Sequence, residues 1–174
     1  MLKILKKHKF TINLILILIF ARLIPHPPNF TPVIAAAIMS SFLFKNLKIS
    51  ISVLITSMLI TDLFIGFYVN IIFVYISLIL IILIFFKFKA KLNFKNLLVA
   101  SFTGSIVFFL ISNFGVWFLG SHGINNVAYD KNFDGLIKCY FYAIPFFKNT
   151  LVSTLFFVYS TFLVNSLYYK FKKA

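Results

Sequence analysis

The sequence predicts an all-α integral membrane protein, a single domain in which six apolar helices form a bundle. Three observations lead to this prediction. The 174-residue chain is 61% hydrophobic, has a mean hydropathy of +1.02 and carries only 11% charged residues, which lies outside the range of soluble globular proteins. The apolar residues fall into six runs, and lysine clusters stand at every second boundary between runs. Such clusters are typical of membrane orientation signals rather than of nucleic-acid binding.

The first run follows a lysine-rich start. A signal peptide has the same layout, but this run leads into an arginine and a proline-rich turn without a small-x-small cleavage site, so cleavage is not expected. The second run covers only about 20 Å of a ~30 Å hydrocarbon core, so its helix is short or continues into its flanks. Residues 136–148 predict an interfacial helix that stops at Pro145. The expected spans are 10–24, 31–44, 49–68, 69–86, 96–119 and 150–169.

The lysine clusters predict the orientation of the bundle. They lie at the start of the chain, at 45–48, at 87–95 and at the end of the chain. Because lysines are retained on the cytoplasmic side, both termini are expected in the cytoplasm. The segment 22–32, the turn 66–70 and the loop 120–148 are then outside.

Residues 22–32, RLIPHPPNFTP, form a polar segment that we call the outer cap. Its four prolines fix their own φ angles and push the residues before them towards extended backbone, which predicts an ordered, non-helical segment. We expect the outer cap to close over a binding pocket at the outer face of the bundle.

Asp62 is the most informative single residue. A carboxylate at the centre of a membrane span costs about 2.5 to 3.5 kcal/mol on insertion scales, so Asp62 requires a partner or a water-filled cavity. Arg22, the single arginine of the chain, lies at a matching depth. The pair has two interpretations: an ion pair that locks the bundle without any ligand, or a pair that organises a binding pocket.

Further polar and aromatic residues lie at the same outer depth. His26 would contact anionic or polar groups together with Arg22, although a loop histidine beside prolines is also a usual solvated residue. Asparagines would exchange hydrogen bonds with a solute, and aromatic rings would supply apolar walls, although Trp117 also fits an interfacial anchor. The candidate binding residues are Arg22, His26, Asn29, Asp62, Asn113, Phe114, Trp117 and Asn149.

The second run carries small residues at a spacing that lets helices approach closely: Ala35, Ala36, Ala37 and Ser40. Internal packing is the default interpretation, and docking of a membrane partner is the alternative.

Catalysis and metal binding find little support, and neither a cofactor nor a metal is expected. The chain lacks a nucleophile signature, paired carboxylates in its spans and a glycine-rich phosphate loop. His26, His122 and Cys139 have no metal-ligand spacing, and a single cysteine excludes an intramolecular disulfide.

Four ordered segments make the chain resemble a family of uncharacterised bacterial six-span membrane proteins. That family is in turn similar to the substrate-capture (S) components of energy-coupling-factor (ECF) vitamin transporters. The match runs over nearly the whole chain from Arg22, but Ser153 and Thr154 stand where the family pattern has a Gly-Asp pair. The segments are 22–32 (RLIPHPPNFTP), 61–66 (TDLFIG), 112–117 (SNFGVW) and 143–150 (AIPFFKNT).

The resemblance implies a six-helix S-component-like fold in the bacterial inner membrane, with a small solute held near the outer face under the first outer loop. It also implies that the small residues 35–37 dock a transmembrane coupling subunit, which works with ATPase subunits. The expected function is therefore capture of a vitamin- or micronutrient-like solute for an ECF-type uptake system. The alternatives are a small membrane scaffold without a small-molecule ligand and an intramembrane enzyme, for which no nucleophile or metal is found.

Overall fold

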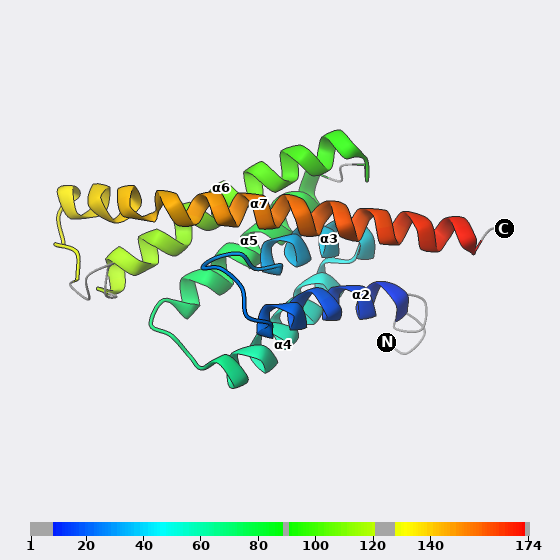
Figure 1. The fold of residues 1–174 in the computed structure, drawn as a ribbon, viewed down its shortest axis with the longest axis horizontal. Helices are drawn as coiled ribbons and strands as arrows, with labels where there is room; N and C mark the ends of the chain where they lie inside the picture. The colour runs from blue at the N-terminus through cyan, green and yellow to red at the C-terminus, as the bar shows by residue number, and fades with distance from the viewer. Residues whose placement is uncertain (1–8, 89–90, 121–127, 173–174) are drawn as a thin grey trace.

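The fold is all-α, as the sequence predicts. A computed structural model describes residues 9–88, 91–120 and 128–172. The first expected run, 10–24, is divided between α2 and the short 3-10 helix η1, and each of the other five runs corresponds to one helix, with ends a few residues from the expected boundaries for the second to fifth runs (Figure 1). The elements are α2 (Lys9–Phe20), η1 (Ala21–Leu23), α3 (Val33–Phe44), α4 (Leu47–Ile65), α5 (Ile71–Phe88), α6 (Phe94–Leu119) and α7 (Phe133–Phe171).

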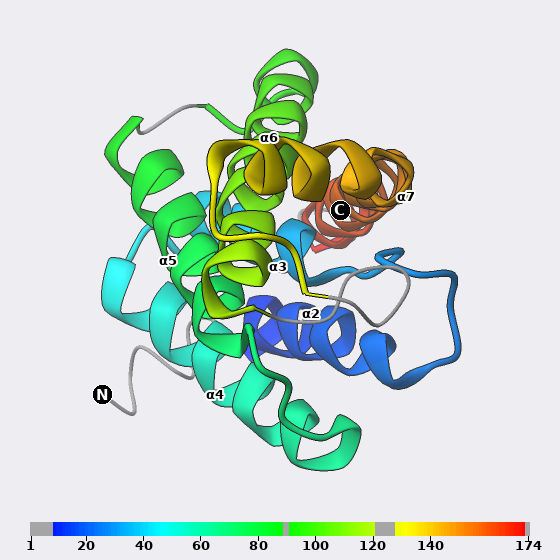
Figure 2. The ribbon, with the colours of Figure 1, turned by 90° about the vertical axis from the view of Figure 1, so that its left-hand side faces the viewer.

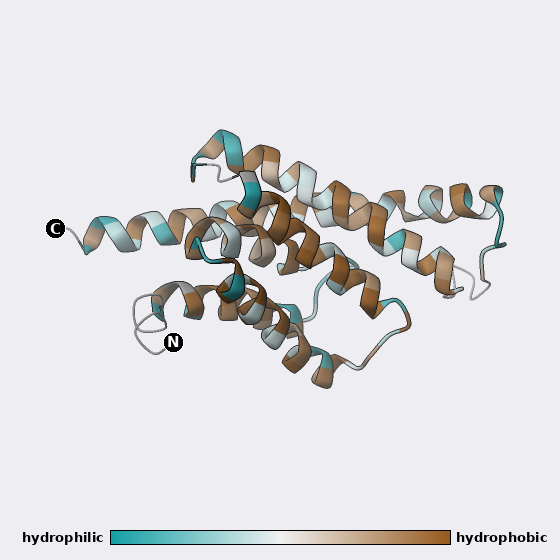
Figure 3. Cartoon of the chain, turned by 180° about the vertical axis from the view of Figure 1, so that it is seen from behind, coloured by the Kyte–Doolittle hydropathy of each residue, from teal (hydrophilic) through white to brown (hydrophobic). Residues whose placement is uncertain are grey.

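The lengths of the helices bear on membrane insertion. Among the described residues, three helices are long and apolar enough to cross a membrane, namely α4, α6 and α7. Shorter apolar helical stretches cover Ile12–Leu23, Val33–Phe44 and Ile71–Lys87. The outside of the bundle exposes large apolar side chains such as Leu63 and Phe64, and polar residues gather at helix ends and loops (Figure 3). These features indicate association with a membrane.

Helix α3 is the centre of the bundle. It packs against α2, α4, α5, α6 and α7, and eleven of its twelve residues are buried (Figure 2). Because a helix that is apolar all round can be stable only when it is buried, the composition of this run explains its position. Twelve residues extend about 18 Å, which also explains why α3 is shorter than a membrane crossing.

The small residues of α3 face the interior of the bundle. Ala35, Ala36, Ala37 and Ser40 have no exposed surface. The expected docking face for a partner at these positions is therefore wrong for this conformation, and the internal-packing interpretation is favoured. The close approach is visible at Gly104 of α6, where an added Cβ would lie 3.0 Å from the Cδ1 atom of Ile38.

Buried hydroxyl groups connect α3 to its neighbours through backbone carbonyls. Ser50 of α4 donates to the carbonyl of Ser40 at 3.0 Å, and Ser41 donates to the carbonyl of Ile82 at 3.3 Å. Most other buried hydroxyls bond to carbonyls three or four residues earlier in their own helix, as those of Ser153 and Thr154 do. These hydroxyl groups place many uncharged polar atoms in the interior, each bonded to a backbone carbonyl.

Helix α7 continues through Pro145, so the expected stop at this residue is wrong. Proline lacks the N–H that would bond four residues back, and its ring crowds the carbonyl at that position. The helix tolerates this by bending: its first part, in yellow, runs at an angle to the orange and red remainder (Figures 1 and 2). The interfacial segment and the last apolar run therefore form one helix of 39 residues.

The two ends of the bundle differ in chemistry. The end that holds the outer cap, the turn 66–70 and the loop before α7 is called the cap end below. The opposite end is called the lysine end, because it gathers Lys9, Lys45, Lys48, Lys87, Lys91, Lys95, Lys170 and Lys172.

Candidate functional site

A buried ion pair lies at the cap end. The Nη2 atom of Arg22, in η1, is 2.8 Å from Oδ1 of Asp62, in the last turn of α4. The side chains are 9% and 0% exposed, respectively. The partner that the sequence predicts for Asp62 is therefore confirmed.

The neighbours of the pair come from two helices, α4 and α5. Nη1 of Arg22 donates to Oγ1 of Thr61 and to the sulfur of Met58, each at 3.0 Å. The hydroxyl of Tyr75, in α5, donates to Oδ2 of Asp62 at 2.6 Å. We call these five residues the charged cluster; it links η1, α4 and α5.

One oxygen of Asp62 is incompletely satisfied. Oδ2 accepts from Tyr75, whereas Oδ1 is buried and has only the charge contact with Arg22, without an aligned hydrogen bond. A carboxylate has about four acceptor positions, so Asp62 can accept a further donor.

Tyr68, in the turn between α4 and α5, lies beside the charged cluster. Burial raises the pKa of Tyr68 to about 12, the negative charge of Asp62 adds to the rise, and Arg22 opposes it. The phenol is therefore neutral at physiological pH and can both donate and accept a hydrogen bond.

The outer cap lies at this end, and its residues 23–29 are exposed. The two ring nitrogens of His26 lie 3.0 Å from the carbonyl oxygen of Pro27 and 3.2 Å from that of Arg22, so the ring folds back on the outer cap. Asn29 is exposed and has φ 59°, a left-handed conformation that asparagine tolerates well. His26 and Asn29 are therefore close to Arg22 in the sequence, and both are exposed on the outer cap.

Asn149 fixes the outer cap to α7. Its Nδ2 donates to the carbonyl of Pro28 at 3.0 Å. Close by, the ring of Phe30 packs 6.0 Å from that of Phe157 and 6.5 Å from that of Phe156. In this conformation Asn149 holds the outer cap in place instead of facing Asp62.

The remaining candidates lie on α6 and do not join the charged cluster. Asn113 donates to the carbonyl of Phe109 in its own helix at 2.8 Å. Phe114 packs with Phe73 of α5 and with Phe118.

Trp117 donates from Nε1 to the carbonyl of Asp130 at 2.9 Å, and Nζ of Lys131 lies 5.6 Å from its ring centroid. Lys131 also donates to the carbonyls of Trp117 and Phe118, which places a cation at the negative end of the α6 dipole. Trp117 and Lys131 therefore hold the segment before α7 against the end of α6.

Sequence reasoning missed Met58, Thr61 and Tyr75 in the charged cluster, and it missed Tyr68 beside the cluster. A signal for Tyr75 exists in the helical hairpin itself. Asp62 precedes the end of α4 by three residues, and Tyr75 follows the start of α5 by four, so the two side chains lie at similar depth.

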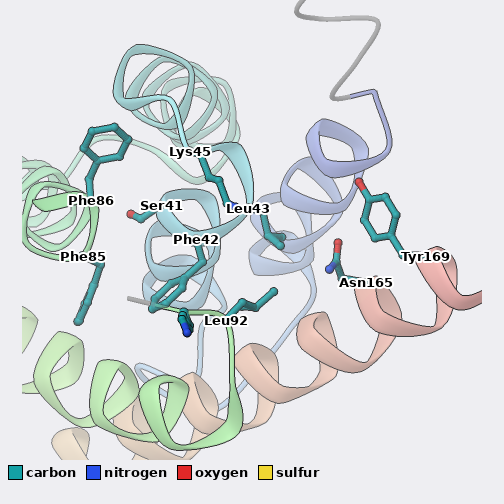
Figure 4. A pocket seen from close by; sticks show the side chains of 10 residues that line it. Ser41, Phe42, Leu43, Lys45, Phe85, Phe86, Leu92, Asn165 and Tyr169 are labelled. Carbon is teal, nitrogen blue, oxygen red and sulfur yellow. The ribbon is translucent and has the colours of Figure 1, made fainter. Parts of the chain in front are cut away.

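A cavity of about 600 Å³ lies at the lysine end, between the ends of α3, α5 and α7 (Figure 4). Its position differs from that of the pocket expected beneath the outer cap, and none of the candidate binding residues lines it.

Metal ligands do not gather in the described part of the chain: no group of three or more His, Cys, Asp or Glu side chains is placed to hold a metal ion there. His122 lies outside the described residues.

The fold and the cluster define an all-helical protein with an apolar exterior, suited to a membrane, that keeps one buried Arg-Asp pair at the cap end. The chain belongs to the family of unknown function DUF6580, whose profile matches residues 3–174. Comparison with curated proteins and with solved structures found no match.

Proposed function

We propose that this protein is a membrane-embedded capture protein for a small polar solute, vitamin- or micronutrient-like, in an ECF-type uptake system. The solute binds at the cap end, against the charged cluster. The observation that carries the proposal is the buried Arg22–Asp62 pair, which lies at the same end of the bundle as the exposed, proline-rich outer cap that Asn149 of α7 holds.

The charged cluster offers chemistry suited to a polar solute. The guanidinium of Arg22 can bind an anionic group, and Asp62 can accept from an amine or hydroxyl at its incompletely satisfied Oδ1. The phenols of Tyr68 and Tyr75 add hydrogen-bonding groups beside them. A solute that carries both an acidic group and a hydrogen-bond donor would replace the internal ion pair: its acidic group would bind Arg22, and its donor would bind Asp62.

The outer cap would control access. Its contact with α7 rests on the hydrogen bond from Asn149 to Pro28 and on the packing of Phe30. Releasing these contacts would uncover Arg22 without disturbing α3 at the centre of the bundle. His26 and Asn29, exposed on the outer cap, would then be placed to meet the solute.

The membrane arrangement that goes with this function has six spans in the bacterial inner membrane and both termini in the cytoplasm. The lysine end then faces the cytoplasm, which agrees with the positive-inside rule. Energy would come from separate coupling and ATPase subunits, and a coupling subunit would contact the exposed apolar faces of the bundle, since residues 35–37 are buried.

A membrane scaffold without a small-molecule ligand is the second candidate. The observation that favours it is the set of contacts that Arg22 already makes, to Asp62, Thr61 and Met58. Buried ion pairs can serve to fix a unique packing arrangement, and such a pair needs no solute.

Native mass spectrometry of protein extracted in a mild detergent separates the two candidates. Wild type is compared with Asp62→Asn, which removes the charge and preserves the shape, and with Lys138→Gln, an exposed cation of α7 outside the cluster. Arg22→Lys is the third variant and keeps the positive charge, whereas alanine at this position would leave Asp62 as an unpaired buried charge.

Capture predicts a discrete additional small mass in wild type and in Lys138→Gln, reduced in Arg22→Lys and lost from the Asp62→Asn protein that remains folded, so that Asp62→Asn loses more bound mass than folded yield. Equal losses of bound mass and folded yield in Asp62→Asn would favour the structural role. Folded protein without any additional mass, and without a thermal shift on addition of a panel of vitamins, would favour the scaffold.

A further inference from the structure

The cavity at the lysine end is lined by both apolar and polar side chains. Its volume of about 600 Å³ lies in the range of small-molecule sites. Phe42 of α3, Phe85 of α5 and Leu92 supply apolar surface. Lys45, Lys91 and Asn165 supply the polar groups, and Figure 4 shows the side chain of Asn165 directed from α7 towards the ends of α2 and α3. The lining therefore fits an amphipathic ligand.

Asn165 provides a buried acceptor without a partner. Its side chain is only 6% exposed, and its Oδ1 has no hydrogen bond within the described residues. A buried acceptor that loses its bonds to water destabilises the folded state unless another donor replaces them. A ligand in the cavity that carries a hydroxyl or N–H group would supply this donor.

The two lysines provide positive charge without a nearby acid. The chain has only three acidic side chains, Asp62, Asp130 and Asp134, and all of them lie at the cap end. Along α4 alone, Asp62 is about 22 Å from the helix start that follows Lys45. Lys45 also has a left-handed φ of 52°, where glycine or asparagine is the usual residue. Lys45 and Lys91 are exposed at the mouth of the cavity, and no acidic side chain of the chain lies at this end, so an anion from outside the chain can approach both lysines.

We propose that this cavity binds an anionic glycerophospholipid with a hydroxylated headgroup. The phosphate lies between Lys45 and Lys91, a headgroup hydroxyl donates to Oδ1 of Asn165, and the first part of an acyl chain contacts the apolar side chains. Basic pockets between helices at the cytoplasmic side of a membrane are suited to anionic headgroups. A soluble glycerol phosphate has the same polar groups, but it would leave the apolar side chains without a contact. This inference is independent of the solute site at the cap end.

Native mass spectrometry with defined lipids tests the proposal. Wild-type protein, stripped of lipid in mild detergent, is titrated with dioleoyl phosphatidylglycerol, with dioleoyl phosphatidylcholine and with dioleoyl phosphatidic acid, which lacks the headgroup glycerol. The lysine variant is Lys45→Gln/Lys91→Gln. Its matched control is Lys48→Gln/Lys95→Gln, two exposed lysines of the same end that do not line the cavity.

Phosphatidylglycerol is expected to bind wild type and the control pair alike, and to bind the Lys45/Lys91 variant about thirtyfold more weakly. Asn165→Leu is expected to remove the preference for phosphatidylglycerol over phosphatidic acid, and Asn165→Ala, which also lacks an acceptor, gives a second variant that is read in the same way. Equal losses in the two lysine pairs would overturn the proposal, because they would reflect surface charge alone. Equal affinity for phosphatidylcholine, or equally tight binding of soluble glycerol 3-phosphate, would overturn it as well.

Discussion

Removing the charge of Arg22 while keeping most of its length, by Arg22→Met, is expected to lower the free energy of unfolding by about 3 to 5 kcal/mol. Asp62 has no exposed surface, so the variant leaves a buried carboxylate whose remaining contact is the hydroxyl of Tyr75. Coulomb's law gives an attraction of similar size. Two unit charges about 4 Å apart at an effective dielectric constant of about 20 attract by about 4 kcal/mol.

A double-mutant cycle isolates the interaction of the two charges. Asp62→Asn removes the carboxylate charge, and the double variant Arg22→Met/Asp62→Asn leaves neither charge in the interior. The double variant should therefore be more stable than the sum of the two single losses predicts, with a coupling energy of about 2 kcal/mol or more.

Unfolding by sodium dodecyl sulfate in bicelles, followed by the fluorescence of Trp117, measures these free energies. Trp117 is the single tryptophan and contacts the segment before α7 rather than the charged cluster, so the substitutions do not remove a direct contact of the probe. If the single variants each cost less than about 1 kcal/mol and their effects are additive, Arg22 and Asp62 do not form the buried pair described above.

Three further changes test other parts of the structure. Gly115→Ala should lower the free energy of unfolding by about 1 to 3 kcal/mol, because the added Cβ would overlap the ring of Phe73. Adding Phe73→Ala to this variant should recover part of the loss. An unchanged unfolding curve for Gly115→Ala would contradict this packing. Asn149→Ala should speed amide hydrogen exchange in the outer cap while costing only about 1 kcal/mol, and equal protection in both proteins would show that the bond to Pro28 is dispensable. For Tyr68 the folded-state pKa of about 12 is above the ordinary tyrosine value of 10.0, so wild type should lose stability as pH rises between these values. Tyr68→Phe should lose less stability over the same pH range. Identical pH profiles of the two proteins would refute the burial of the phenol.

The helices could be predicted from the sequence because their signals are local. Apolar runs and lysine clusters determine where helices lie, and asparagines mark three helix starts. Asn46, Asn93 and Asn132 each accept a hydrogen bond from the backbone N–H three residues later. Pro145 gave the wrong boundary, because proline removes only one backbone bond and the helix can bend around it.

The charged pair could be predicted for a different reason. Arg22 is the single arginine and Asp62 the single carboxylate within an apolar run, so depth alone leaves few pairings. Depth does not determine the direction in which a side chain leaves its helix. Asn113 and Trp117 therefore share the depth of Asp62 but bond elsewhere, to Phe109 and Asp130.

The same limit applies to the small residues of α3. In a helix that is apolar all round, hydropathy does not distinguish a face that meets another protein from one that meets the other helices of the bundle.

The bend of α7 has a consequence for how the protein sits in a bilayer. A helix of 39 residues extends about 58 Å, nearly twice the hydrocarbon thickness, so a straight α7 would project far into water or tilt steeply. The bend allows the part before Pro145 to lie in the headgroup layer, where Gly135, Cys139 and Ala143 face the bundle and Phe141 is exposed. In a bilayer, a surface segment joined in one helix to a spanning segment would oppose rocking of the bundle and would fix its immersion depth. The outer cap, which α7 holds through Asn149, would then keep a constant height above the acyl chains.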